Sequence, residues 1–223
     1  MQQTPMHDEI NDMLFALIPP DAERVVEVGC SSGAMGQAFL RQHPDAEYIG
    51  IELVEEYAAR ARERLSEVVV ANVEHLEDRT FEVLRPTDCW IFGDVLEHLY
   101  DPWRTLKRVR ESLGERGCVV ACIPNAQHWS LQAQLNAGNL RYADTGLLDR
   151  THIRFFTRKT IIELFDQCGY EIEEIGGKVV EGHPLSFAAL EAVRAFATAA
   201  GFDTAEAARD AAPYQYLVRA RRR

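Results

Sequence analysis

The chain has 223 residues, of which 47% are apolar and 9% aromatic. These fractions exclude a disordered chain and indicate one folded domain, with or without an appendage. The formal net charge of −11 argues against nucleic acid as a partner. No apolar run is long enough for a membrane span, and an odd number of cysteines without a secretion signal predicts a cytoplasmic protein.

The first element in the chain is an N-terminal segment, residues 1–22. Apolar residues at helical spacing predict a helix over residues 8–18, which ends at Pro19 and Pro20. We expect this helix to pack against the core ahead of the first strand.

A short apolar run over residues 25–28 leads directly into a turn of small residues and a helix over 34–42. Gly29 and Gly33 let a ligand approach the main chain, and the helix start offers free N–H groups. Glu27 interrupts the apolar run, and because an unpartnered carboxylate in a buried strand is costly, it indicates a functional role. The turn lacks the second glycine of G-x-G-x-x-G, which argues against NAD binding.

A second apolar run, residues 48–53, contains Glu52 at its end. This residue lies about 20 residues past the turn, the offset at which a carboxylate binds ribose hydroxyls in doubly wound folds. Alternatively, Glu52 supplies negative charge to the N-terminus of the helix predicted over residues 54–65, but Glu55 and Glu56 already supply that charge.

Further strands and helices alternate along the rest of the chain. The predicted strands cover residues 68–71, 88–93, 118–123, 171–180 (with an interruption at Gly176-Gly177) and 214–220, and the predicted helices cover 103–113 and 158–168. This order predicts an α/β fold with a doubly wound, mostly parallel sheet and helices on both faces.

The turn reads Glu-x-Gly-x-Ser-x-Gly and resembles the nucleotide-binding turn of class I S-adenosylmethionine-dependent methyltransferases, with Ser31 in place of the middle glycine. The run that starts at Asp94, DVLEHLYDP, is similar to that of small-molecule and glycan methyltransferases, including ubiquinone-biosynthesis O-methyltransferases. Residues 148–157 resemble a segment of methyltransferases encoded with polysaccharide-building enzymes. The resemblance implies a Rossmann-like, seven-stranded sheet whose last two strands are antiparallel, with 214–220 at the edge.

The resemblance also implies S-adenosylmethionine as the cofactor. It places the following residues against the cofactor: Glu27, Gly29, Cys30, Ser31, Gly33, Glu52, Leu53, Asn72, Val73, Gly93 and Asp94. For the side chain of Asn72, capping of the following turn is an equally good interpretation.

Three of the seven histidines fall in segments that face an acceptor: His98, His128 and His152. Imidazole suits a base that works near neutral pH. We expect His152 to be the base or to orient the acceptor, with His98 and His128 as the next candidates. A structural role for His98, bonding a loop backbone, is slightly favoured.

The expected substrate contacts are Asn125, Trp129 and Arg154, although Arg154 could instead pair with Asp149. Phe155 and Phe156 are expected in the core or the pocket wall. The sequence shows no Asp-Asp or His-Asp-Asp cluster, so no metal site is expected.

These observations predict a single methyltransferase domain over 1–223, with a substrate cap at 126–156 and a helical insertion at 184–212. The insertion could form a lid or a homodimer face through Leu190, Val193, Phe196 and Ala197, but packing on its own domain is favoured. The expected activity is O-methylation of a sugar hydroxyl in polysaccharide or natural-product assembly. Alternatives are a quinone-type or other small-molecule O- or N-methyltransferase, and a catalytically silent cofactor-binding subunit.

Overall fold

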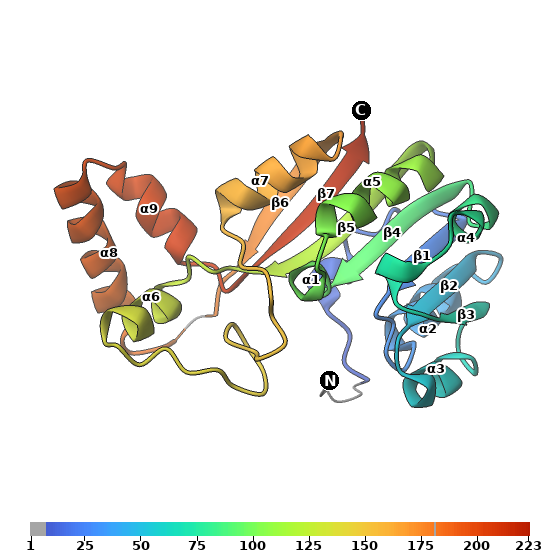
Figure 1. The fold of residues 1–223 in the computed structure, drawn as a ribbon, viewed down its shortest axis with the longest axis horizontal. Coiled ribbons are helices and arrows are strands. Elements are labelled where there is room, and N and C mark those ends of the chain that lie inside the picture. The colour runs from blue at the N-terminus through green and yellow to red at the C-terminus, as the bar shows by residue number, and fades with distance from the viewer. Residues whose placement is uncertain (1–7, 181) are drawn as a thin grey trace.

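The computed structural model describes residues 8–180 and 182–223, which form a seven-stranded sheet (Figure 1). The strands lie in the order β3-β2-β1-β4-β5-β7-β6. Strands β1 to β5 are parallel, and β7 is antiparallel to both of its neighbours. Their bounds are β1 Arg24–Val28, β2 Glu47–Glu52, β3 Glu67–Val70, β4 Thr87–Gly93, β5 Leu113–Pro124, β6 Tyr170–Lys178 and β7 Gln215–Arg222.

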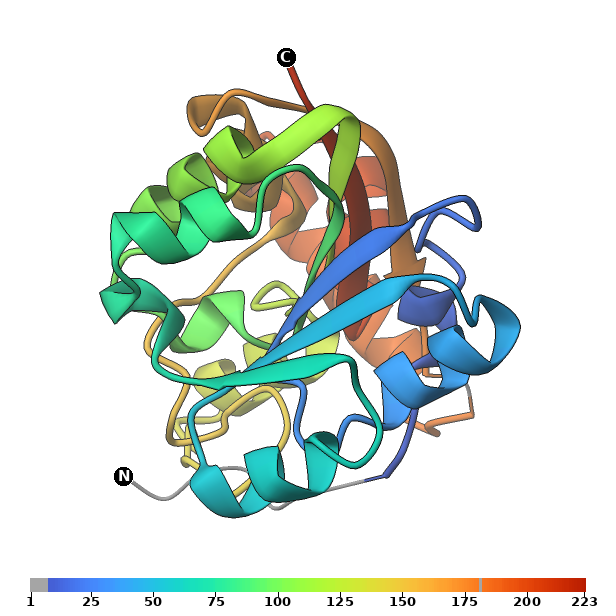
Figure 2. The ribbon, with the colours of Figure 1, turned by 90° about the vertical axis from the view of Figure 1, so that its right-hand side faces the viewer.

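Helices cover both faces of the sheet (Figure 2). Leu14, Phe39 and Ala61 from α1 (Asp12–Phe15), α2 (Ala34–Gln42) and α3 (Glu55–Ala61) belong to the core on one face. The core on the other face includes residues of α4 (Asp78–Val83), α5 (Pro102–Ser112) and α7 (Arg158–Gln167). Strand residues alternate between the two cores, as the two-residue period of a strand requires. The doubly wound fold expected from the sequence is therefore confirmed.

Three further helices lie on the side of the molecule away from β1, β2 and β3 (Figure 1). They are α6 (Trp129–Asn136), α8 (Ser186–Ala200) and α9 (Thr204–Ala211). The helical insertion divides at the Gly201 turn, as predicted, and Asp203 caps α9. Within its predicted dimer face, Ala197 is buried whereas Phe196 is exposed.

The carboxyl ends of β1, β2, β3 and β4 meet at one edge of the sheet, where a doubly wound fold binds its ligand. Two short 3₁₀ helices follow two of these strands: η1 (Val73–His75) after β3 and η2 (Leu96–His98) after β4. The order of elements therefore brings the loops after β1 to β4 to the same edge.

The N-terminal helix is shorter than predicted, since α1 starts at Asp12 rather than at residue 8. The side chain of Asn11 accepts a hydrogen bond from the N–H of Leu14 and so caps the helix start. Asp8 lies outside the helix, where its carboxylate forms a salt bridge with Arg64.

The last strand is not at the edge of the sheet, which corrects the sequence-based expectation. β7 lies between β5 and β6, and β6 forms the edge. The predicted interruption of β6 is also wrong, because Gly176 and Gly177 stay paired with Leu217 and Tyr216. A Cβ on Gly177 would lie 2.5 Å from Pro213, so this glycine leaves room for the proline ring.

None of the helices within the described residues is long and apolar enough to cross a membrane. The five cysteines, Cys30, Cys89, Cys118, Cys122 and Cys168, are all unbridged and buried.

Candidate active site

The turn after β1 has the compact backbone that its small residues predict. Gly29 and Gly33 adopt positive φ angles of 72° and 78°, and Ser31 adopts 49°. A Cβ on Gly29 would lie 3.0 Å from a methyl group of Val95, so the turn lies close to the loop after β4. Glycine suits positions 29 and 33, because a Cβ disfavours a positive φ angle.

Glu52 joins the end of β2 to this turn. Its carboxylate is buried and accepts hydrogen bonds of 2.9 Å from the N–H groups of both Ser31 and Val54. Each carboxylate oxygen can accept more than one hydrogen bond, so both oxygens keep capacity for ligand hydroxyls. The Ser31 turn and Glu52, both of which are expected to bind the cofactor, are therefore in direct contact.

Glu27 lies in the interior of the sheet near the end of β1. The hydroxyl of Tyr48 donates a hydrogen bond of 3.0 Å to its carboxylate. Burial raises the pKa of Glu27 to about 7, while this hydrogen bond lowers it and Glu52 raises it further. The folded protein therefore holds Glu27 in a position where the ionised form of its carboxyl group is unfavourable.

The other predicted cofactor residues follow β2, β3 and β4. Leu53 is half exposed and Val73 is buried, and the side chain of Asn72 accepts a hydrogen bond from the N–H of Glu74. Asn72 thus caps η1, which is the alternative role that its sequence position allows.

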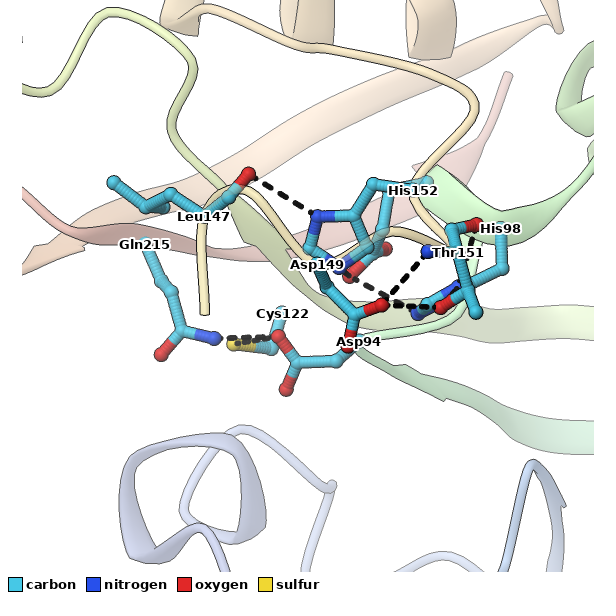
Figure 3. A network of polar contacts seen from close by, with 9 residues as sticks. Asp94, His98, Cys122, Leu147, Asp149, Thr151, His152 and Gln215 are labelled. Atoms are coloured by element: carbon cyan, nitrogen blue, oxygen red, sulfur yellow. Dashed lines mark hydrogen bonds and ion pairs between the residues drawn. The ribbon is translucent and has the colours of Figure 1, made fainter. Parts of the chain in front are cut away.

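Asp94 follows Gly93 and has a positive φ of 55°. Its carboxylate accepts hydrogen bonds from Gln215 and Cys122, so it contacts β7 and β5 from the loop after β4 (Figure 3). A non-glycine residue in this conformation is uncommon and indicates a constrained position.

A cluster of three side chains lies next to these contacts: Glu97, His98 and His152. The Nε2 atoms of His152 and His98 lie 3.8 Å and 4.0 Å from Oε1 of Glu97. The two imidazole rings meet edge to face, with centroids 4.8 Å apart. Figure 3 shows both histidines beside Asp149 and Thr151.

Main-chain hydrogen bonds explain how residues so distant in sequence come together. The carbonyl of Glu97 accepts hydrogen bonds of 3.0 Å from the N–H groups of Ile153 and Arg154. These bonds tie the loop before α7 to η2. The loop therefore carries His152 to the side chain of Glu97.

The tautomers of both histidines follow from their partners. Nδ1 of His152 lies 3.3 Å from the carbonyl of Leu147, and Nδ1 of His98 lies 3.2 Å from the carbonyl of Thr151. The Thr151 hydroxyl is 3.1 Å from the same Nδ1, but its proton goes to Asp149. A carbonyl can only accept, so each Nδ1 carries the proton and each Nε2 has a lone pair. Burial lowers the pKa of both imidazoles, which favours the neutral form.

A family model described as a methyltransferase domain matches residues 2–175. The chain belongs to this methyltransferase family. A malonyl-[acyl-carrier protein] O-methyltransferase of Geobacter sulfurreducens is 28% identical to it over 186 residues, which cover 79% of this chain. The match covers 66% of that relative, so this methyltransferase spans less than two thirds of its length.

Solved structures of methyltransferases share the fold. A possible histamine N-methyltransferase of Thermotoga maritima superposes with a TM-score of 0.61 at 15% identity, covering 95% of this chain and 86% of the other. Magnesium protoporphyrin IX methyltransferase of Synechocystis PCC 6803, with bound S-adenosylhomocysteine, gives 0.62 at 12% identity, covering 95% and 81%. The class I S-adenosylmethionine-dependent methyltransferase fold is thereby confirmed.

The residues of this methyltransferase fit S-adenosylmethionine. The buried carboxylate of Glu52 lies at the end of β2, where an acceptor for ribose hydroxyls is needed, and it contacts the Ser31 turn. Glu27 and Asp94 place two more carboxyl groups near the ends of β1 and β4, where they suit a cofactor that carries positive charge.

We expect Glu52→Gln to weaken S-adenosylmethionine binding by roughly 10- to 100-fold, because a hydrogen bond to a charged group contributes about 1.5–3 kcal/mol. Titration calorimetry measures this change. Glu47→Gln is the matched control, since Glu47 lies at the opposite end of the same strand. Equal affinity in the Glu52 variant and the wild-type protein would contradict the role of Glu52.

His128 has a structural environment of its own in the methyltransferase. It is buried, and its Nδ1 lies 2.7 Å from the Ser130 hydroxyl at the start of α6. Burial lowers the pKa of His128 to about 4. Its ring packs against Trp129 and Tyr214, so this histidine lies outside the cluster of Glu97, His98 and His152.

Two predicted substrate residues are held within the protein. Asn125 is completely buried, and both hydrogens of its amide are used by the carbonyls of Asp210 and Pro213. Trp129 is 9% exposed and packs against His128 and His183. These contacts connect the loop after β5 to the α8–α9 region.

Arg154 does not pair with Asp149, which corrects one of the two interpretations of its role. It is exposed, donates a hydrogen bond to the carbonyl of Tyr100 and lies over the ring of Trp103. Asp149 instead accepts hydrogen bonds from the N–H and hydroxyl groups of Thr151. Phe156 is in the core and Phe155, which is 47% exposed, lines a surface pocket with Trp103, so both agree with the expectation of core or pocket wall.

Glu97 is the residue that sequence reasoning did not name. Its position in DVLEH, directly before His98, is the signal that was available. The proximity of His152, 55 positions further along the chain, depends on the loop contacts and could not be inferred from spacing.

Proposed function

We propose that this methyltransferase transfers the methyl group to an acceptor oxygen held beside His152 and His98. When bound, the cofactor supplies an electrophilic methyl group, which bonds to the acceptor oxygen as the C–S bond breaks and leaves its electron pair on sulfur. The observation that carries the proposal is the pair of imidazoles, His152 buried and His98 partly buried, whose Nε2 lone pairs lie near the end of β4. A hydroxyl acceptor needs such a group to orient it or to take its proton.

The first candidate acceptor is a sugar hydroxyl. This choice is supported by the likeness of residues 148–157 to methyltransferases encoded with polysaccharide-building enzymes. The proposed cap over residues 126–156 contributes Trp129, which packs against His183, and its ring would become a sugar platform if His183 moved away. A quinone-type phenol is a second hydroxyl acceptor that fits the same two imidazoles.

A carboxylate is the other candidate, because the curated relative is named for O-methylation of malonyl-[acyl-carrier protein]. An ionised carboxylate already has a nucleophilic oxygen and needs no base. Its methylation would depend on orientation alone, so the two acceptor classes predict different consequences of changing His152.

The test is a transfer assay with methyl-labelled S-adenosylmethionine over nucleotide sugars, oligosaccharides, small phenols, amines and a malonyl thioester. We expect label in the sugar or phenol fractions. Label only in the amine fraction would overturn O-methylation. Cofactor binding without label in any fraction, including with cell extract as acceptor source, would support the non-catalytic subunit instead.

A further inference from the structure

The side chain of Glu97 has no hydrogen-bond partner although it is 1% exposed. Neither carboxylate oxygen receives a donor from the described residues, 8–180 and 182–223. A carboxylate in this position is costly unless a proton or a cation compensates it. The orphaned carboxylate therefore indicates a missing positive partner.

The two neighbouring histidines do not supply that partner in their neutral form. Their Nδ1 atoms face carbonyl oxygens, so the atoms directed at Glu97 are the Nε2 lone pairs. One carboxylate oxygen and two imidazole nitrogens, all acceptors, thus face a common point. Carbonyl acceptors behind metal-binding imidazoles are the usual means of fixing the tautomer that binds a metal.

The charges around the cluster favour a cation. The carboxylate of Asp149 lies beside both histidines, because it accepts the hydrogen bond of the Thr151 hydroxyl, which is 3.1 Å from Nδ1 of His98 (Figure 3). Within the described residues, the salt-bridge partners of Glu97 are only the two histidines, and Asp149 has no lysine or arginine partner. A dication would neutralise this local negative charge.

The distances also suit one ion. The three ligand atoms lie within 4.8 Å of one another, and the two pairs that include Glu97 are 3.8 Å and 4.0 Å apart. With bonds of about 2.0–2.2 Å at tetrahedral angles, two ligand atoms of one ion lie about 3.3–3.6 Å apart, somewhat closer than these atoms are now. Small side-chain movements therefore bring all three atoms to bonding distance.

We propose that Glu97, His98 and His152 bind a divalent first-row transition-metal ion, such as Zn²⁺, in the acceptor half of the site. Two imidazoles and one carboxylate suit such an ion better than Mg²⁺, which prefers oxygen ligands. Three protein ligands leave a coordination position open for an acceptor oxygen. An acceptor hydroxyl bound there loses its proton to water more readily.

The role of the ion rests on the proposed function, but the binding of the ion does not. If the ion is bound, Nε2 of His152 is a ligand, and the residue orients the acceptor through the metal rather than taking its proton directly. His98 has the same role.

The experiment is a Co²⁺ titration of tag-free protein from which metals have been removed with a chelator, followed by visible absorption. We expect saturation at one equivalent, with the absorption bands of a Co²⁺ site of low coordination number. Zn²⁺ is expected to displace Co²⁺, and Mg²⁺ is not. A titration without saturable absorption would overturn the site.

Glu97→Gln is the variant of choice, because a glutamine amide can donate to the Nε2 atoms and so preserve the fold. We expect it to keep the wild-type melting temperature and to lose the Co²⁺ absorption. His75→Ala, which changes an exposed histidine of η1, is expected to retain the absorption. Unchanged Co²⁺ binding in Glu97→Gln would overturn the assignment.

The two proposals fail in different ways. Stoichiometric Co²⁺ binding without methyl transfer to any acceptor would overturn the proposed function and support the metal site. Oxygen methylation that is unaffected by chelators, in protein that binds no Co²⁺, would support the proposed function and overturn the metal site.

Discussion

His152→Ala is expected to lower the turnover number of methyl transfer to a hydroxyl by roughly 10²- to 10⁴-fold, because the acceptor loses the group that takes its proton or that holds the ion which acidifies it. Nε2 of His152 lies 3.8 Å from Glu97 in the cluster proposed to hold the acceptor. The ring lies outside the cofactor turn, so the affinity for S-adenosylmethionine should change little. Single-turnover transfer and cofactor calorimetry on the same protein separate the two effects.

The control for this variant is His75→Ala, which removes an imidazole from η1 and should leave turnover unchanged. His152→Gln provides a second test, because it keeps a side chain of similar length against Leu147 while removing the imidazole. If the acceptor proves to be a carboxylate, both substitutions should reduce turnover far less. Full activity on a hydroxyl acceptor in both variants would contradict the role of His152.

Glu27→Gln is expected to stabilise the fold by about 3 kcal/mol at pH 8 and by only about 1 kcal/mol or less at pH 5. Burial raises the pKa of Glu27 from 4.5 to about 7. Between these values the folded protein holds a proton that the unfolded chain releases, so wild-type stability falls as pH rises through this window. Above pH 7 the full cost of ionised, buried Glu27 remains, and glutamine removes it.

Urea denaturation at several pH values from 5 to 8 measures this difference. The carbonyl oxygen of the substituted glutamine can still accept the hydrogen bond from Tyr48. Glu111→Gln, at an exposed position of α5, should show no such dependence on pH. A constant difference between wild type and Glu27→Gln across this range would contradict the raised pKa of Glu27.

The same substitution should weaken S-adenosylmethionine binding, because the cofactor is cationic and the glutamine side chain is neutral. A variant that is more stable but binds less cofactor would show that the buried acid is retained for function at the expense of stability. Tighter binding in Glu27→Gln would contradict this role.

The order of strands and helices along the chain could be predicted, because each element has its own local sequence pattern. The apolar runs at residues 25–28 and 88–93 and the helix over 34–42 lie within β1, β4 and α2. The predictions were wrong where contacts between residues distant in sequence determine the structure. The position of β7 depends on pairing with β5, whose residues lie about 100 positions earlier. Gly176 and Gly177 look like a strand break in the sequence, but both pair with β7, and Pro213 packs against Gly177.

The cofactor half and the acceptor half of the site also differ in how far the sequence could predict them. Glu52 and the Ser31 turn lie on successive elements at the same sheet edge, so their proximity follows from the parallel topology. The partnership of Glu97 with His152 depends on the path of the loop over residues 147–156, which has no regular structure to predict. The amide of Asn125 likewise finds its carbonyl partners near the far end of the chain.

The position of β7 has a consequence for folding during synthesis. Until residues 215–222 have left the ribosome, β5 has no partner on its outer side and β6 has no neighbour in the sheet. The nascent chain therefore exposes an unpaired edge while the α8–α9 segment is being translated. We expect a ribosome-bound intermediate in which the half built from β1 to β4 resists protease before the other half does.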